Sequence, residues 1–278
     1  MRTLIRLFVT WLVYVLIFML AKPLFMLLNA PVYGWASWRD YVDVMWHGLR
    51  LDMGVAGYLT ALPAVISLVG IWLRTGCRII RYSYQVYFLV TSLVISAVLT
   101  LNTALYGFWK FPLDMTPLFY FSTSPASAVA SVSWLFILIG VAVMFFLTLI
   151  IYLIFREIYQ EQNGQPVSTK SKTWLTVGVL LFMGLLVIPI RGGFTVSTLN
   201  PSAAYYSPHQ SLNHAAINPA FSLLYSATHQ VDFDSMGRYF DDPQAASLFD
   251  ELHVRSAPDS LTDVMASHHP DIYVIIME

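Results

Sequence analysis

Five long runs of apolar residues dominate the chain, and short polar segments separate them. A helix needs roughly 20 mostly apolar residues to cross a hydrocarbon core of about 30 Å. Each run has about that length, which predicts five membrane-spanning helices rather than soluble core helices. The predicted spans are Leu4 to Leu28, Met53 to Leu73, Tyr84 to Trp109, Ser131 to Phe155 and Thr173 to Ile190.

Composition supports a membrane protein. Hydrophobic residues make up 57% of the 278 residues and charged residues 11%, whereas soluble domains have about 45–50% and about 25%. Mean hydropathy is +0.64. The net charge of -1 and the lack of a dense basic run indicate no nucleic-acid partner. The single cysteine, Cys77, provides no disulfide framework.

The first apolar run has two interpretations. Arg2 and Arg6 resemble the basic region of a signal peptide. However, the run is longer than the usual 7 to 15 residues or so, and no convincing small-residue cleavage site follows it. We therefore expect a retained membrane anchor.

The positions of lysine and arginine predict the orientation, because these residues concentrate in cytoplasmic loops. With a cytoplasmic N-terminus, eight lie on the inner side and four on the outer side, and everything after Ile190 is extracytoplasmic. The inner set is Arg2, Arg6, Arg74, Arg78, Arg81, Arg156, Lys170 and Lys172, and the outer set is Arg39, Arg50, Lys110 and Arg191. Aromatic residues are expected at the outer interface, namely Trp35, Trp38, Trp46, Trp109, Phe119, Tyr120 and Phe121.

Polar residues near the spans suggest packing rather than transport. Lys22 is expected to extend its ammonium group to the outer interface. The segment Trp46 to Asp52 is expected to be an outer turn with its charges in water; alternatively, Arg50 and Asp52 touch a lipid head group. Gly57 predicts close helix packing, and Asn102 predicts a hydrogen bond between helices. With no acidic residue or histidine expected inside the spans, transport is the least favoured function.

After the fifth span the chain becomes more polar. We expect residues 191–268 to form an extracytoplasmic helical tether. Short helices are predicted at Ala203 to Tyr206 and at Leu212 to Ser226, the second interrupted by Pro219, and we expect them to lie on the membrane or against a globular domain. Asp241 is the expected N-cap, and Pro243 the first-turn proline, of a helix that ends near Leu252.

The last ten residues, 269–278, read His-Pro-Asp-Ile-Tyr-Val-Ile-Ile-Met-Glu. A β-branched apolar run after a Pro-Asp turn predicts a buried parallel strand. Open sheets of parallel strands bind ligands beyond the strand C-termini, where Glu278 lies. The histidines lack the spacing of a zinc-binding helix and are expected to be structural or solvated.

Several segments together resemble a known family. They are the five spans, Arg191-Gly192-Gly193, the stretch Leu212-Asn213-His214-Ala215-Ala216-Ile217-Asn218-Pro219, the run Leu223-Leu224-Tyr225-Ser226, and the closing Pro-Asp-Ile-Tyr-Val-Ile-Ile-Met-Glu. In this combination the chain resembles the N-terminal membrane part of bacterial lipoteichoic acid synthase-like phosphoglycerol transferases. That family belongs to the alkaline phosphatase and sulfatase superfamily, alongside the phosphoethanolamine transferases.

The resemblance implies a fold and a chemistry. The fold is an all-α membrane domain over residues 1–190, the helical tether 191–268, and the first strand of an α/β sulfatase-like domain at 269–278. Glu278 is implied to bind a divalent metal, Mn or Mg by its oxygen ligand. The nucleophilic threonine and the other metal ligands are expected beyond this strand.

The implied activity is head-group transfer at the outer face of a bacterial plasma membrane. The donor is a membrane phospholipid, and the acceptor is a glycan or lipid of the cell envelope. Two alternatives remain open, namely a phosphodiesterase or sulfatase-type hydrolase of the same superfamily, and a non-catalytic membrane protein that binds lipid or a partner. Residues 1–278 alone are expected to be inactive.

Overall fold

The computed structural model describes residues 2–73, 78–125, 132–160, 168–194, 198–229 and 239–252. Within these ranges every regular element is a helix and none is a strand. The chain divides into two compact units, residues 1–230 and 231–278, which we describe separately. The strand predicted at 269–278 lies outside the described residues and stays a prediction.

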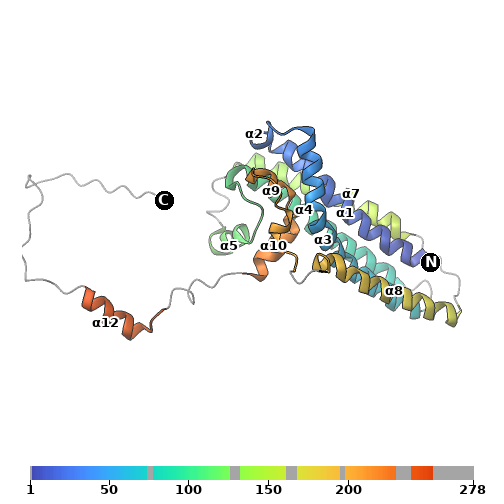
Figure 1. Ribbon diagram of the computed structural model, residues 1–278. Helices are drawn as coiled ribbons and strands as arrows, with labels where there is room; N and C mark the ends of the chain where they lie inside the picture. The colour runs from blue at the N-terminus through green and yellow to red at the C-terminus, as the bar shows by residue number, and fades with distance from the viewer. Residues whose placement is uncertain are drawn as a thin grey trace, which may run out of the picture. The chain divides into compact units, whose positions relative to one another are not determined.

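Five long helices form the first unit and run side by side (Figure 1). Each is long and apolar enough to cross a membrane, which confirms the prediction of five such helices. The helical conformation of these segments is expected in a membrane, because lipid offers no hydrogen-bond partners and a helix satisfies its own backbone N–H and C=O groups. The five are α1 (Arg2–Leu28), α3 (Trp38–Trp72), α4 (Arg78–Trp109), α7 (Trp134–Gln160) and α8 (Thr169–Arg191).

Short helices complete the described part of the chain. In the first unit they are α2 (Ala30–Tyr33), α5 (Thr116–Thr123), the 3-10 helix η1 (Pro201–Ala204), α9 (Gln210–Ala216) and α10 (Pro219–Thr228). The second unit contains α12 (Asp242–Leu252), as the sequence predicts. In α12 the carboxylate of Asp241 accepts a hydrogen bond from the backbone N–H of Gln244 at 3.1 Å.

The second span begins much earlier than expected. We predicted its start at Met53, but α3 begins at Trp38 with a capping box in which Asp40 accepts from the backbone N–H of Ser37 at 2.7 Å. Its 35 residues would extend roughly 52 Å at about 1.5 Å per residue. The helix is therefore longer than a hydrocarbon core is thick, and the segment Trp46 to Asp52 is helix rather than a turn.

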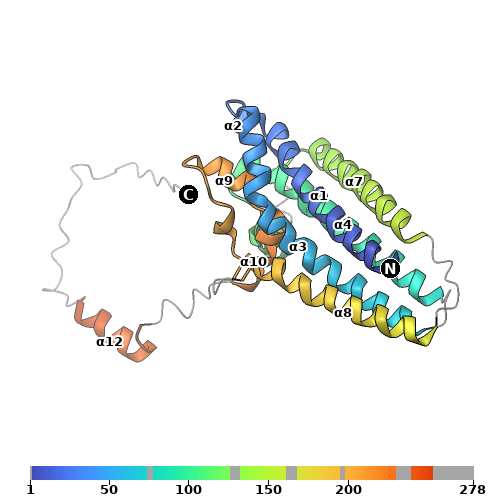
Figure 2. The same cartoon turned by 45° about the vertical axis from the view of Figure 1, so that its right-hand side comes forward.

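The helix α3 is central to the packing. It lies against α1 on one side and α8 on another, while α4 packs mainly against α7 (Figure 2). Gly57 permits the close approach of α8, since a Cβ at this position would lie 2.7 Å from Cγ1 of Ile190. The prediction of close packing at Gly57 is thereby confirmed.

Aromatic rings join α1, α4 and α7 where those helices meet. The rings of Tyr14 and Phe155 are 4.4 Å apart between centroids, and those of Phe88 and Phe155 are 4.7 Å apart. Tyr84 and Tyr159 continue the cluster at 4.4 Å. Aromatic pairs at such distances stabilise packing by about 0.5–1.5 kcal/mol each beyond area burial.

The bundle has two distinct ends. At one end the segment 198–229 packs against α1, α3 and α4. Its contacts with α3 lie in the first half of that helix, at Gly48, Asp52 and Gly54, and we call this end the junction end. At the other end lie the first residues of α1, α4 and α8 and the last of α7. We call it the arginine end, after Arg2, Arg6, Arg78, Arg81 and Arg156.

Replacing Gly57 with leucine is expected to destabilise the bundle by about 1–3 kcal/mol, because the new side chain would overlap Ile190. Gly140 provides a matched control within α7, since nothing lies within 4 Å of a Cβ built there. The measurement is thermal unfolding of the detergent-purified protein. Equal melting temperatures for Gly57→Leu and Gly140→Leu would contradict the described contact between α3 and α8.

Candidate functional site at the junction end

A buried ion pair joins the first two long helices. Lys22 of α1 donates from Nζ to Oδ2 of Asp52 in α3. The side chains are 3% and 0% exposed, so neither charge has significant access to solvent. Each charge therefore depends on its protein partners, rather than on water, for compensation.

Asn218 adds a third element to this pair. Its Nδ2 donates to Oδ1 of Asp52 at 2.9 Å. Its Oδ1 accepts from the backbone N–H groups of Ala220 at 3.0 Å and Phe221 at 3.1 Å, so that Asn218 is also the N-cap of α10. Asp52 is therefore bound through one oxygen to a membrane helix and through the other to the segment that follows the fifth span.

Gly48 makes room for this arrangement. It lies one turn before Asp52 on the same face of α3. A Cβ at Gly48 would overlap both the carbonyl oxygen of Ala216 and the Lys22 side chain. The backbone at the end of α9 and the stem of Lys22 thus occupy the space that a larger residue would fill.

Three sequence predictions at this site are wrong. Lys22 does not extend to the interface but is buried against Asp52. Asp52 lies neither in water nor free for a lipid head group, because it is fully buried. An acidic residue does lie within a spanning helix, so the argument against transport that relied on its absence no longer holds. Because both charges are paired and buried, this cluster indicates a structural role.

Arg50 anchors the end of the last long helix. Its Nε donates to the carbonyl oxygen of Gly192 at 2.8 Å, and a second guanidinium nitrogen contacts the same oxygen. Gly192 has φ +86° and Gly193 has φ +123°, left-handed conformations that glycine adopts without strain. The Arg-Gly-Gly segment noted in the sequence is thus the C-terminal cap of α8.

Further contacts hold the segment 198–229 against the junction end. The hydroxyl of Tyr33 donates to the carbonyl oxygen of Ser211 at 2.9 Å. Ser226 Oγ accepts from the backbone N–H of Met115 at 3.0 Å. The expected short helices therefore pack on the bundle itself, and Pro219 begins α10 rather than interrupting a longer helix. The buried side chains of these helices include Leu212, Ala216 and Phe221.

Asn102 forms a different contact from the one predicted. Its Oδ1 accepts from the backbone N–H of Leu113 at 3.0 Å, so it holds the segment after α4 rather than a neighbouring helix.

Three of the described histidines lie against aromatic rings. His47 stacks on Tyr206 at 4.2 Å between ring centroids, and His209 lies 4.7 Å from Trp35. His214 is 3.2 Å from the hydroxyl of Tyr106 through Nδ1. Burial lowers the pKa of His214, and a hydrogen bond with the backbone of Lys110 partly opposes that shift. His214 therefore favours its neutral form.

Tyr206 has an unsatisfied polar group at this end. Its hydroxyl is buried and has no hydrogen-bond partner among the described residues. Burial, together with the negative charges of Asp43 and Asp40, raises the pKa of Tyr206 to about 12. The phenol thus stays protonated at neutral pH, and its stacking on His47 indicates that the ring mainly packs.

The metal site implied by the family resemblance involves a residue outside the described part of the chain. Glu278 lies outside the described residues, as do His253, His268 and His269. Among the residues that are described, no group of three or more histidine, cysteine, aspartate or glutamate side chains is placed to hold a metal ion.

The described fold defines a helical protein with five helices able to cross a membrane. No family model matches the chain, and neither the curated proteins nor the solved structures include a match. Any narrower assignment therefore depends on the residues themselves.

Removing one member of the ion pair is expected to destabilise the protein by about 3–5 kcal/mol, because the partner charge would remain buried and unpaired. Lys22→Met and Asp52→Asn should each lower the melting temperature. The double variant Lys22→Met/Asp52→Asn should recover part of the loss, since the introduced amide would carry no charge and could still accept from Asn218.

Thermal unfolding in detergent measures these differences, and Lys110→Met serves as the control because Lys110 is exposed. Additive losses in the double variant would show that Lys22 and Asp52 do not interact, contrary to the described contact.

Proposed function

We propose that this chain is the membrane part of an extracytoplasmic, metal-dependent transferase. The enzyme would move a phosphoglycerol or phosphoethanolamine-type head group from a membrane phospholipid to a glycan or lipid of the cell envelope. Glu278 would be one ligand of its divalent metal, Mn or Mg. The proposal begins from the sequence resemblance, and the contacts at the junction end support it.

The observation that carries this proposal is the hydrogen bond between Asn218 and Asp52. The stretch Leu212 to Pro219 contributes to the family resemblance, and Asn218 within it fixes the post-membrane segment on the bundle. A segment bound in this way would position whatever follows it at one membrane face. This is what a transferase requires when its donor is a lipid.

We further propose that the junction end is extracytoplasmic and that the membrane is a bacterial plasma membrane. The excess of lysine and arginine at the arginine end supports this orientation. Aromatic side chains at the junction end are exposed, as at a lipid–water interface, including Trp35, Trp38 and Trp46.

Cysteine labelling in intact cells tests the orientation. In a Cys77→Ser background, Ser202→Cys is expected to react with a membrane-impermeant maleimide, because Ser202 is exposed at the junction end. The native Cys77 should react only after the cells are permeabilised. Labelling of Cys77 and protection of Ser202→Cys in intact cells would reverse the proposed orientation.

Head-group release tests the chemistry. The complete reading frame that encodes this chain is expressed and reconstituted in vesicles that contain phosphatidylglycerol or phosphatidylethanolamine with a labelled head group. Diacylglycerol should form in the presence of Mn²⁺ when the vesicles also contain a lipid acceptor with a free hydroxyl group, and the labelled head group should appear on that acceptor. Glu278→Gln should reduce the rate by more than about 10–100-fold, which is the loss typical of mutating only the outer partners that orient a metal ligand. Residues 1–278 alone should give no turnover.

Each alternative predicts another outcome. Head-group release that needs no acceptor and yields the free phosphate ester indicates a hydrolase. A stable protein that releases no head group from either lipid indicates a non-catalytic membrane protein. Turnover by residues 1–278 alone would contradict the assignment of the chemistry to residues beyond the strand.

A further inference from the structure

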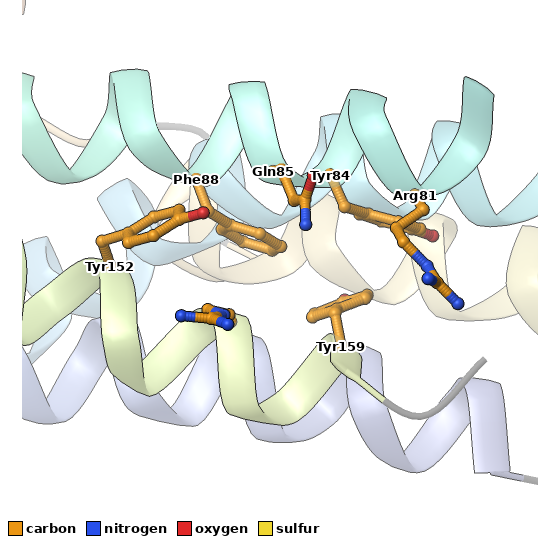
Figure 3. Close-up of a pocket in the computed structure, with 7 residues that line it drawn as sticks. Arg81, Tyr84, Gln85, Phe88, Tyr152 and Tyr159 are labelled. Carbon is orange, nitrogen blue, oxygen red and sulfur yellow. The ribbon is translucent and has the colours of Figure 1, made fainter. Parts of the chain in front are cut away.

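A cavity of about 190 Å³ lies between α4 and α7 at the arginine end of the bundle. Figure 3 shows residues of both helices facing one another across it. The lining residues are Arg81, Tyr84, Gln85, Phe88, Tyr152, Arg156 and Tyr159. They recur at spacings of three and four, so each helix presents one face to the cavity.

The cavity combines apolar rings with cationic groups. Tyr84, Phe88 and Tyr159 are buried and present their rings, whereas Arg81, Gln85 and Arg156 are exposed. The hydroxyls of Tyr84 and Tyr159 already have partners, at 2.7 Å from Ser67 Oγ and 3.1 Å from Thr10 Oγ1. The groups left to bind a ligand are thus two guanidinium groups, an amide and the Tyr152 hydroxyl.

Among the residues that the structure describes, no acidic side chain in the lining of the cavity compensates the charges of the two arginines. No carboxylate lines the cavity, and Glu157, next in sequence to Arg156, is exposed and is not among the lining residues. Among the described residues neither Arg81 nor Arg156 forms an ion pair. Arg6 of α1 adds a third cation, close enough to interact electrostatically with Tyr84 and Tyr159.

The surroundings indicate where a ligand would come from. Beside the cavity, α4 exposes Val86 and Leu89, and α7 exposes Leu153 and Ile154. In a membrane these side chains face acyl chains, so the opening lies next to lipid near the bilayer surface. Basic pockets between transmembrane helices at that depth bind anionic head groups, and guanidinium groups bind phosphate oxygens in bidentate geometry.

We propose that this cavity binds the phosphodiester head group of an anionic phospholipid from the leaflet at the arginine end. Arg81 and Arg156 contact the phosphate oxygens, Gln85 and Tyr152 hydrogen-bond the remainder of the head group, and the buried rings pack against the glycerol and the first methylenes. This site lies at the opposite end of the bundle from the junction and does not depend on the proposed transferase activity.

The test uses the whole chain in lipid nanodiscs of phosphatidylcholine, with and without a minor fraction of phosphatidylglycerol. Native mass spectrometry after release into detergent measures the lipid that stays bound. We expect phosphatidylglycerol to be retained in preference to phosphatidylcholine. Arg81→Gln and Arg156→Gln should each reduce that preference about five-fold.

Arg78→Gln is the matched control, because Arg78 is an exposed arginine of the same helix that does not line the cavity. It should leave the preference unchanged. Should a glutamine variant fail to fold, Arg81→Lys and Arg156→Lys keep the charge but lose the bidentate geometry, and an intermediate preference is expected.

Three results would overturn the proposal. Equal losses in Arg78→Gln and Arg81→Gln would indicate general surface attraction. No preference for phosphatidylglycerol over phosphatidylcholine would exclude an anionic lipid site. Complete displacement of the lipid by inorganic phosphate or glycerol phosphate at millimolar concentration would indicate a site for a soluble anion instead.

Discussion

The arrangement of the first unit depends on how the carboxylate of Asp52 is satisfied. Burying a carboxylate away from water costs several kcal/mol even after relaxation, and this cost is recovered only if both oxygens find partners. One oxygen binds Lys22 of α1, and the other binds Asn218 at the start of α10. The association of two membrane helices and the docking of the later segment are therefore energetically coupled, because losing either partner leaves a buried charge incompletely bound.

The two ends of the bundle differ in whether their charged side chains are paired. At the junction end, Lys22 and Asp52 neutralise each other beneath packed helices, and Arg50 binds a helix-terminal carbonyl oxygen. At the arginine end, Arg81 and Arg156 remain at the rim of a cavity without an acidic neighbour in its lining. Pairing neutralises the two buried charges at the first end, whereas the cavity at the second end leaves two guanidinium groups exposed.

Sequence patterns could predict the five spans, because a run of about 20 apolar residues is rare outside membrane-spanning helices. They could not predict the ion pair, because we placed the start of the second span at Met53, which left Asp52 in a loop. The signal that could have corrected this start is Ser37 with Asp40 three residues later, a capping box that marks the first turn of α3. If α3 starts at Trp38, Asp52 lies inside a membrane helix. A carboxylate in that position needs a cationic partner, and Lys22 of the first helix could have been proposed for that role.

Asn218 illustrates a different limit of prediction. The Asn-Pro pair could have indicated an N-cap with proline in the first turn, and with it the start of α10. The Nδ2 group of Asn218 binds Asp52, which lies 166 positions away in the sequence. No local pattern contains that information. The same applies to Gly48, whose need for a small side chain arises only from Ala216 and Lys22 packed against it.

Docking of the segment 198–229 changes what the expected tether can do. Residues 191–268 comprise 78 positions (268 − 191 + 1), but the docked part ends at residue 229, so 39 positions (268 − 230 + 1) remain before the predicted strand. A fully extended chain spans at most about 3.3–3.6 Å per residue, and helical residues such as those of α12 span only about 1.5 Å each. Halving the number of undocked residues therefore halves the upper limit on the distance that they can span. A catalytic domain that follows the strand would thus be confined near the membrane, and the hydrogen bond between Asn218 and Asp52 would contribute to that confinement.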